Sequence, residues 1–251
     1  MHYKIIVIGA TFAAAGIVSA CGDDCLVLER RPQAGYEVFN AINFGHSYET
    51  QLKSLQAKQM YQDFSQKGAF SGERICLFPC AEVLYRLLEN KNVLLNMDIL
   101  SVVRENGIFT VTACGVSGCR TFTADRVVDT RVHPNMVREK SLNLIINTDR
   151  EGLLPPAGVS DEKWGHPGDL LVKLPVSREW DYLQARKAVL DYVSTLPEAF
   201  RVVFVADCFC WTVDGTFPEE KDGICYLPSV WFANPLVALD EGVCFAREVL
   251  L

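Results

Sequence analysis

The sequence predicts an α/β fold, and three observations support that prediction. Residues 4–8 form an almost continuous apolar run, which is typical of a parallel strand covered on both faces. Residues 81–90 carry apolar side chains at helical spacing, and several short strand-like runs follow them. The chain has 251 residues, of which 49% are apolar, so it is long enough to bury a substantial core.

The N-terminal elements follow one another in an informative order. The strand at 4–8 ends at Gly9, and the small apolar residues 10–20 suit a helix that packs closely on a sheet. A second strand is predicted at 25–28, and Glu29 stands at its end, twenty residues after Gly9. This spacing is typical of a dinucleotide-binding βαβ unit, in which the helix N-terminus binds a pyrophosphate and the acid accepts hydrogen bonds from a ribose.

The same segment allows a second interpretation. Lys4 precedes an apolar stretch that ends in Val18-Ser19-Ala20-Cys21, which is similar to a lipoprotein signal peptide. Only the βαβ interpretation requires a second strand that ends in an acid, and Glu29 meets this requirement. We therefore favour the βαβ unit.

The glycine pattern of this unit is incomplete. The template Gly-x-Gly-x-x-Gly/Ala falls on Gly9, Thr11 and Ala14, so that threonine replaces the second glycine. That glycine normally lets the backbone approach the pyrophosphate closely. The Thr11 side chain is expected either to crowd the phosphate or to donate a hydrogen bond to it through its hydroxyl.

The later part of the chain predicts a β-meander and a small second layer of mixed structure. We expect residues 1–135 together with 225–251 to form the nucleotide-binding domain, and residues 136–224 to form a small α+β insertion that serves as a substrate or cap region. Asn234 followed by Pro235 indicates a well-defined helix start. The remaining predicted elements are a loop at 32–47, a polar helix at 48–67, a helix at 81–90, meander strands at 93–95, 98–104, 108–113 and 120–124, strands at 124–130, 142–147 and 169–174, a helix at 180–195, and a strand at 201–206.

Charge and cysteine content argue against several classes of function. The net charge of −7 argues against nucleic acid as a partner, and we expect no membrane partner. The ten cysteines are spread along the chain without the spacing of a zinc ribbon. We therefore expect reduced thiols, no metal site and a cytoplasmic location.

Taken together, these features resemble the FAD-dependent oxidoreductases of the glutathione-reductase-like superfamily. The resemblance covers most of residues 1–135 and 225–251. It depends on Val7-Ile8-Gly9-Ala10 with Glu29-Arg30-Arg31, on the helix at 81–90 leading into Val93-Leu94-Leu95-Asn96, on Arg126-Val127-Val128-Asp129-Thr130, and on Asn234-Pro235-Leu236.

The resemblance implies a Rossmann-like FAD/NAD-binding domain with FAD as the cofactor. Two segments depart from the family pattern, because Thr130-Arg131-Val132 replaces the usual Ala-Thr-Gly and Val230-Trp231-Phe232 replaces the usual Gly-Asp. By resemblance, Gly9, Thr11, Phe12 and Ala14 would line the pyrophosphate, Glu29 and Arg30 would lie at the adenosine, the backbone near Ile99 would face the adenine, and Asn234, Pro235 and Leu236 would present a helix N-terminus to the flavin.

The leading expectation is an oxidoreductase that transfers a hydride between FAD and a small organic substrate, either alone, as a homo-oligomer, or with a larger oxidoreductase partner. Two alternatives stay open. One is a protein that binds NAD or another adenine nucleotide, and the other is a non-catalytic accessory subunit with a degenerate nucleotide site. The sequence identifies no catalytic acid or base. His46, His133 and His166 lie in loop-like segments, and Arg178 and Arg201 could bind an anion. Residues of these types are more often ordinary solvated or turn residues, so we favour that interpretation for all five.

Overall fold

The computed structural model describes residues 1–150, 155–160 and 164–250. An eight-stranded sheet has the order β13-β14-β8-β1-β2-β5, with β7 paired to β8 and β6 paired to β7. β1 pairs in parallel with β2 and β8, and β5 and β14 continue the parallel pairing on the two sides. The strands are β1 (His2–Ile8), β2 (Cys25–Leu28), β5 (Val93–Leu94), β6 (Asp98–Glu105), β7 (Ile108–Gly115), β8 (Gly118–Asp129), β13 (Glu219–Lys221) and β14 (Ile224–Tyr226).

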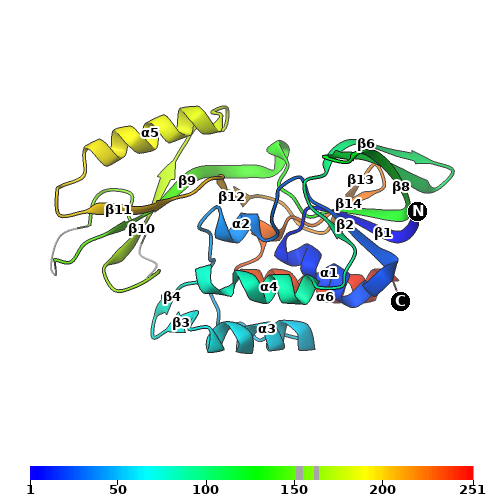
Figure 1. The fold of residues 1–251 in the computed structure, drawn as a ribbon, viewed down its shortest axis with the longest axis horizontal. Coiled ribbons are helices and arrows are strands. Elements are labelled where there is room, and N and C mark those ends of the chain that lie inside the picture. The colour runs from blue at the N-terminus through cyan, green and yellow to red at the C-terminus, as the bar shows by residue number, and fades with distance from the viewer. Residues whose placement is uncertain (151–154, 161–163, 251) are drawn as a thin grey trace.

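β1 is buried on both faces, as its apolar run predicts. Ile5 and Val7 belong to one buried cluster together with helix α1 (Phe12–Cys21), whereas Ile6 and Ile8 belong to a second cluster that contains side chains of β7 and β8. Figure 1 shows the corresponding layers, with α1, α4 and α6 on one side of the sheet and β6 on the other. The predicted fold class, a Rossmann-like α/β domain with a parallel sheet and a meander, is confirmed.

The first and last helices pack against each other at two glycines. A Cβ atom added to Gly16 in α1 would lie 2.1 Å from the carbonyl oxygen of Leu239 in α6 (Pro235–Leu250). One added to Gly242 would lie 2.2 Å from the carbonyl oxygen of Ala13. Only glycine permits this approach, so the two residues set the position of α1 against α6. Helices α3 (Leu55–Gln66) and α4 (Ala81–Leu88) pack beside them.

Three predicted strands are arranged differently in the sheet. Residues 93–95 contribute β5 to the parallel sheet, not a strand to the meander. The strands predicted at 120–124 and 124–130 are one continuous strand, because β8 pairs antiparallel with β7 at its start and parallel with β1 at its end. A single strand therefore connects the meander to the parallel sheet.

One predicted helix has a different start, and one predicted loop contains a helix. The helix predicted at 48–67 begins only at Leu55, because the Ser54 side chain accepts a hydrogen bond from the N–H of Ala57 and caps the helix there. The segment 32–47, predicted as a loop, contains the one-turn helix α2 (Tyr36–Phe39). Short 3₁₀ helices lie at Gly22–Asp24, Phe78–Cys80, Pro134–Met136 and Ser229–Trp231, and a small hairpin is formed by β3 (Phe70–Ser71) and β4 (Arg74–Ile75).

One pair of cysteines differs from the expected reduced thiols. Cys114 and Cys119 are joined by a disulfide across the hairpin between β7 and β8. The two residues face each other directly in the antiparallel ladder, with their Cα atoms 4.0 Å apart. The pairing register brings the two sulfur atoms together, which the spacing of the cysteines in the sequence did not indicate.

A second sheet stands apart from the first in Figure 1, and α5 (Tyr182–Ser194) covers it. Its long central strand β9 (Val137–Asn147) pairs antiparallel with β10 (Asp169–Pro175) on one side. β11 (Arg201–Val205) and β12 (Cys210–Val213) pair with the two halves of β9 on the other side. Among the helices of the described residues, none is both long and apolar enough to cross a membrane.

Candidate functional site

The carboxyl ends of the parallel strands meet at the N-terminus of α1, which is where open α/β sheets bind their ligands. The backbone N–H groups of the first three residues of α1 each donate a hydrogen bond to a side-chain oxygen of the protein. Phe12 donates to Glu37 Oε1 at 2.8 Å, Ala13 donates to Ser229 Oγ at 3.3 Å, and Ala14 donates to Thr11 Oγ1 at 3.2 Å. The N–H groups that bind phosphate in a dinucleotide site are therefore already paired within the chain.

The side chain of Thr11 is buried and forms hydrogen bonds within the protein. Its hydroxyl donates to Thr130 Oγ1 at 2.8 Å, and the Thr130 hydroxyl lies within hydrogen-bond distance of the carbonyl oxygens of Ile8 and Gly9. Thr11 and Thr130 are each 1% exposed. The unusual threonine of the glycine motif thus caps α1 and links the end of β8 to the glycine turn.

Glu37, which the sequence analysis did not single out, reaches this helix end from α2. Its Oε1 atom accepts hydrogen bonds from the Phe12 N–H and from the Ser229 hydroxyl, the latter at 3.1 Å. Its Oε2 atom is buried and accepts no hydrogen bond from any residue in the described part of the chain. Burial raises the pKa of Glu37 to about 7, although the N–H of Phe12 opposes this shift. The available signal in the sequence was a lone acid between the apolar neighbours Tyr36 and Val38.

Glu29 lies at the end of β2 and faces the glycine turn. Its carboxylate accepts the N–H of Ala10 at 2.8 Å and the N–H of Arg31 at 2.6 Å, and the residue is 1% exposed. Burial raises its pKa above the ordinary value, against the effect of these two hydrogen bonds. The neighbouring Arg30 points elsewhere and forms an exposed ion pair with Asp98, which precedes Ile99 in β6.

The segment after β8 forms a charged cluster beside the glycine turn. The Arg131 guanidinium donates two hydrogen bonds to Asp129, and His133 Nε2 lies 2.9 Å from the same carboxylate. Burial would raise the pKa of Asp129, but hydrogen bonds from His133 and Arg131 and the charge of Arg131 outweigh it, so the pKa is lowered. A Cβ atom on Gly9 would lie 2.7 Å from Arg131 Cγ, so the arginine covers the turn directly.

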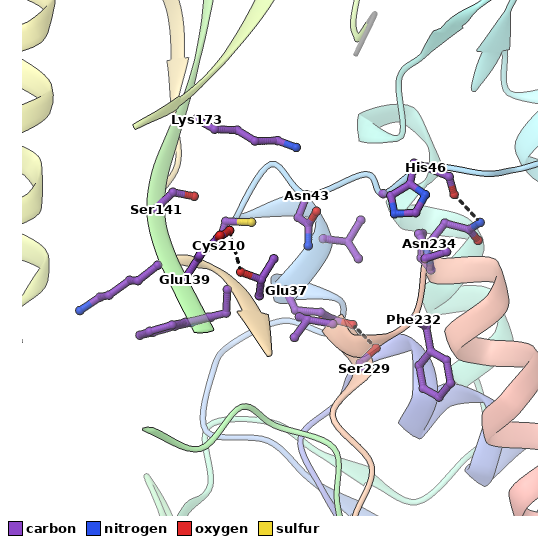
Figure 2. A pocket seen from close by; sticks show the side chains of 18 of the residues that line it. Glu37, Asn43, His46, Glu139, Ser141, Lys173, Cys210, Ser229, Phe232 and Asn234 are labelled. Atoms are coloured by element: carbon purple, nitrogen blue, oxygen red, sulfur yellow. Dashed lines mark hydrogen bonds between the residues drawn. The ribbon is translucent and has the colours of Figure 1, made fainter. Parts of the chain in front are cut away.

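A cavity of about 500 Å³ lies between the N-terminus of α6 and the second sheet. We refer to it as the chamber. Figure 2 shows Glu37 and Ser229 at one end of the chamber and Asn234 and His46 along one wall, with Lys173 extending from β10. Both the part of the protein built on the first sheet and the part built on the second sheet line the chamber. The first part contributes Glu37, Asn43, His46, Ser229, Phe232 and Asn234, and the second contributes Glu139, Ser141, Lys173, Cys210 and Trp211.

Asn234 caps α6 at the chamber, as predicted. Its Oδ1 atom accepts the N–H groups of Leu236 and Val237, each at 3.0 Å, and its amide donates to the carbonyl oxygens of His46 and Ser47. Pro235 occupies the first helical position. The cap therefore fixes both the helix end and the loop that carries His46.

The predicted site residues fall into three groups in space. Gly9, Thr11, Phe12, Ala14 and Glu29 surround the N-terminus of α1, Arg30 lies near Ile99, and Asn234, Pro235 and Leu236 lie at the N-terminus of α6. The remaining candidate residues lie elsewhere, since the Arg178 guanidinium donates to the carbonyl oxygen of Arg138, Arg201 pairs with Asp149 at 2.9 Å, and His166 is exposed in a loop.

Comparison with known proteins identifies the fold. No protein-family model and no curated protein sequence matches the chain. Among solved structures, p-nitrophenol 4-monooxygenase PnpA from Pseudomonas putida DLL-E4 is 12% identical with a TM-score of 0.61, over 98% of this chain and 78% of that one. A flavoprotein/dehydrogenase from Cytophaga hutchinsonii is 12% identical with a TM-score of 0.56, over 98% and 77%. The OxyS anhydrotetracycline hydroxylase from Streptomyces rimosus is 13% identical with a TM-score of 0.60, over 98% and 60%. At these identities the similarity establishes a shared fold.

The sequence resemblance implies FAD, and the chamber and the N-terminus of α1 differ in how well they fit this cofactor. The chamber offers space beside a helix N-terminus, as a flavin ring requires. At α1, the three leading N–H groups have protein acceptors, and the buried carboxylate of Glu37 occupies the helix end. A diphosphate does not fit there while Glu37 keeps this position, because like charges would meet away from water.

Proposed function

We propose that the protein is an FAD-binding oxidoreductase that transfers a hydride between flavin and a small organic substrate. The observation that carries this proposal is the chamber, which opens between the nucleotide-binding layer and the second sheet of a fold shared with a monooxygenase, a flavoprotein/dehydrogenase and a hydroxylase. Ligand sites are commonly concave and lie at the junction of two layers. Membership of the glutathione-reductase-like superfamily is part of the same proposal.

The side chains that line the chamber suit a small substrate with a planar apolar body and a polar group. Trp211 and Phe232 supply aromatic surface, and Asn43 and Ser141 supply hydrogen-bonding groups. Figure 2 shows Lys173 directed from the second sheet toward the side of Asn43 and His46. A cation in this position would favour a substrate that carries a negative charge.

Titration of the purified protein with FAD tests the proposal. We expect a perturbed visible flavin spectrum and a higher melting temperature at saturating FAD, since a ligand that binds only the folded state stabilises it. NAD is titrated in parallel, because the βαβ fingerprint is shared by both dinucleotides. Stabilisation by NAD and not by FAD would contradict the proposal.

A second candidate function is a non-catalytic accessory subunit that keeps the fold. The observation in its favour is that the α1 N-terminus is closed by Glu37, Ser229 and Thr11. This candidate predicts a stable protein that binds neither dinucleotide. We also propose association with a second copy or with a larger oxidoreductase, which light scattering of the protein alone and of its isolated complexes would test.

A further inference from the structure

Glu37 is an anionic side chain held at a position that favours anions. The N-terminus of a helix carries a partial positive charge and exposes N–H donors. Here the carboxylate takes the Phe12 N–H at 2.8 Å and the Ser229 hydroxyl at 3.1 Å. In a dinucleotide-binding fold this end of α1 is where the pyrophosphate binds, so Glu37 occupies the position of a phosphate oxygen.

Only one of the two oxygen atoms of the Glu37 carboxylate accepts hydrogen bonds from described residues. Glu37 is 6% exposed, and its Oε2 atom accepts no hydrogen bond from a described residue. A buried carboxylate with one oxygen unsatisfied is costly, so the arrangement is poorly explained as a device for stability alone. The same side chain lines the chamber, so withdrawing it would connect the α1 N-terminus to that cavity.

We propose that Glu37 is an internal competitor for the nucleotide diphosphate, so that a diphosphate ligand reaches α1 only when this carboxylate is withdrawn or protonated. The inference rests on the proposed function and deepens it by assigning a regulation to the same site. The segment that must move is short, because α2 has only four residues. The movement releases the Phe12 N–H, which a diphosphate oxygen would accept, and it frees the Ser229 hydroxyl, which now donates to Glu37.

The groups around Glu37 make its ionisation sensitive near neutral pH. Glu29 faces it from the end of β2, and its charge raises the pKa of Glu37 further. Burial raises the pKa of Tyr36, in α2 itself, and that of Cys208, in the segment before β12, so both stay neutral between pH 5 and 8. Ser229 contributes only a hydroxyl.

Three charged groups line the same chamber from the second sheet, Glu139 and Lys140 on β9 and Lys173 on β10. Lys140 donates to the carbonyl oxygens of Arg178 and Trp180, which holds its charge in the second sheet. From the end of β2, the carboxylate of Glu29 acts on Glu37 through its charge. Arg31 and Arg131 act in turn on Glu29, whose pKa their charges lower. Adding a diphosphate would place further negative charge beside both acids, which acid pH relieves.

The test compares the wild type with Glu37→Gln and Glu37→Ala at pH 6 and pH 8. The glutamine can still accept the Phe12 N–H and removes only the charge, whereas the alanine also empties the space. Glu49→Gln, at an exposed position, is the matched control. The probes are FAD, ADP and riboflavin, which lacks the diphosphate, and binding is measured by calorimetry and by flavin fluorescence.

We expect FAD and ADP to bind both Glu37 variants about tenfold or more tightly than the wild type at pH 8, with a smaller difference at pH 6. Riboflavin affinity should be the same for the wild type, Glu37→Gln and Glu49→Gln, whereas Glu37→Ala enlarges the chamber and is used only for the comparison of FAD with ADP. Equal affinities of the wild type and both variants for FAD and ADP would overturn the inference while leaving FAD binding intact. Tightened ADP binding without FAD binding would support the inference and reject FAD as the cofactor. Absence of FAD and ADP binding by all four proteins would reject both.

Discussion

Replacing Glu29 by alanine should destabilise the ligand-free protein, because the structure gives this carboxylate an internal role. Glu29 accepts the N–H groups of Ala10 and Arg31. Ala10 is 2% exposed, so its N–H would lose its acceptor away from water, at a cost of about 1–3 kcal/mol. Arg31 is exposed, and its N–H can donate to water instead, so the loss of this hydrogen bond adds nothing to the expected free-energy cost. For a chain of this size, such a loss lowers the melting temperature by roughly 2–12 °C.

Thermal and urea unfolding of the ligand-free protein measure this effect. Glu29→Gln keeps one acceptor oxygen and should lose less stability than Glu29→Ala, and Glu49→Ala provides an exposed control. The sequence resemblance instead implies that the carboxylate faces a ribose. If Glu29→Ala unfolds like the wild type but binds ADP more weakly, the carboxylate faces a ligand and the reasoning from the structure is wrong.

Three further predictions concern helix α1 and the residues that contact it. The pKa of Glu37 is about 7 in the folded state against an ordinary 4.5, so the folded protein binds a proton more tightly than the unfolded chain does. The stability of the wild type relative to Glu37→Gln should therefore be highest near pH 4.5, fall by roughly 3 kcal/mol as the pH rises to about 7.5, and be constant above that pH. Urea unfolding of both proteins from pH 4.5 to 8.5 measures this difference, and parallel stability curves would contradict it. Thr11→Gly removes the α1 cap and the hydrogen bond to Thr130, and should cost about 1–2 kcal/mol in chemical unfolding, whereas Thr11→Ser should cost less. Gly16→Ala places a methyl group against the Leu239 carbonyl and should cost about 1–3 kcal/mol, so a thermal transition equal to that of the wild type would show that the helices can separate freely.

The elements that the sequence predicts well are those whose signal is local. The run at 4–8 predicts β1 because both faces of that strand are buried, and the pair Asn234-Pro235 predicts the start of α6 because the cap lies within three residues. β8 was predicted as two strands, since nothing local indicates that one strand can leave a meander and join a parallel sheet.

The occupied helix end was not predictable from local patterns. Glu37 is 25 residues from Phe12 in sequence and 192 residues from Ser229, so their contact depends on the complete fold. Thr11 and Thr130 are likewise 119 residues apart. The sequence motif correctly placed α1 and the end of β2 at Glu29, but it could not indicate which oxygen atoms the helix would receive from elsewhere in the chain.

The close contact of α1 with α6 also constrains when the protein can fold. Gly16 and Gly242 hold the two helices together, although more than two hundred residues separate them. During synthesis on the ribosome, α1 emerges early and must wait for its partner, because residues 235–250 are made much later. Contacts over such sequence distances also slow folding. The glycine turn and its helix therefore acquire their final geometry after translation of α6, and until then the apolar surface of α1 lacks the helix that buries it.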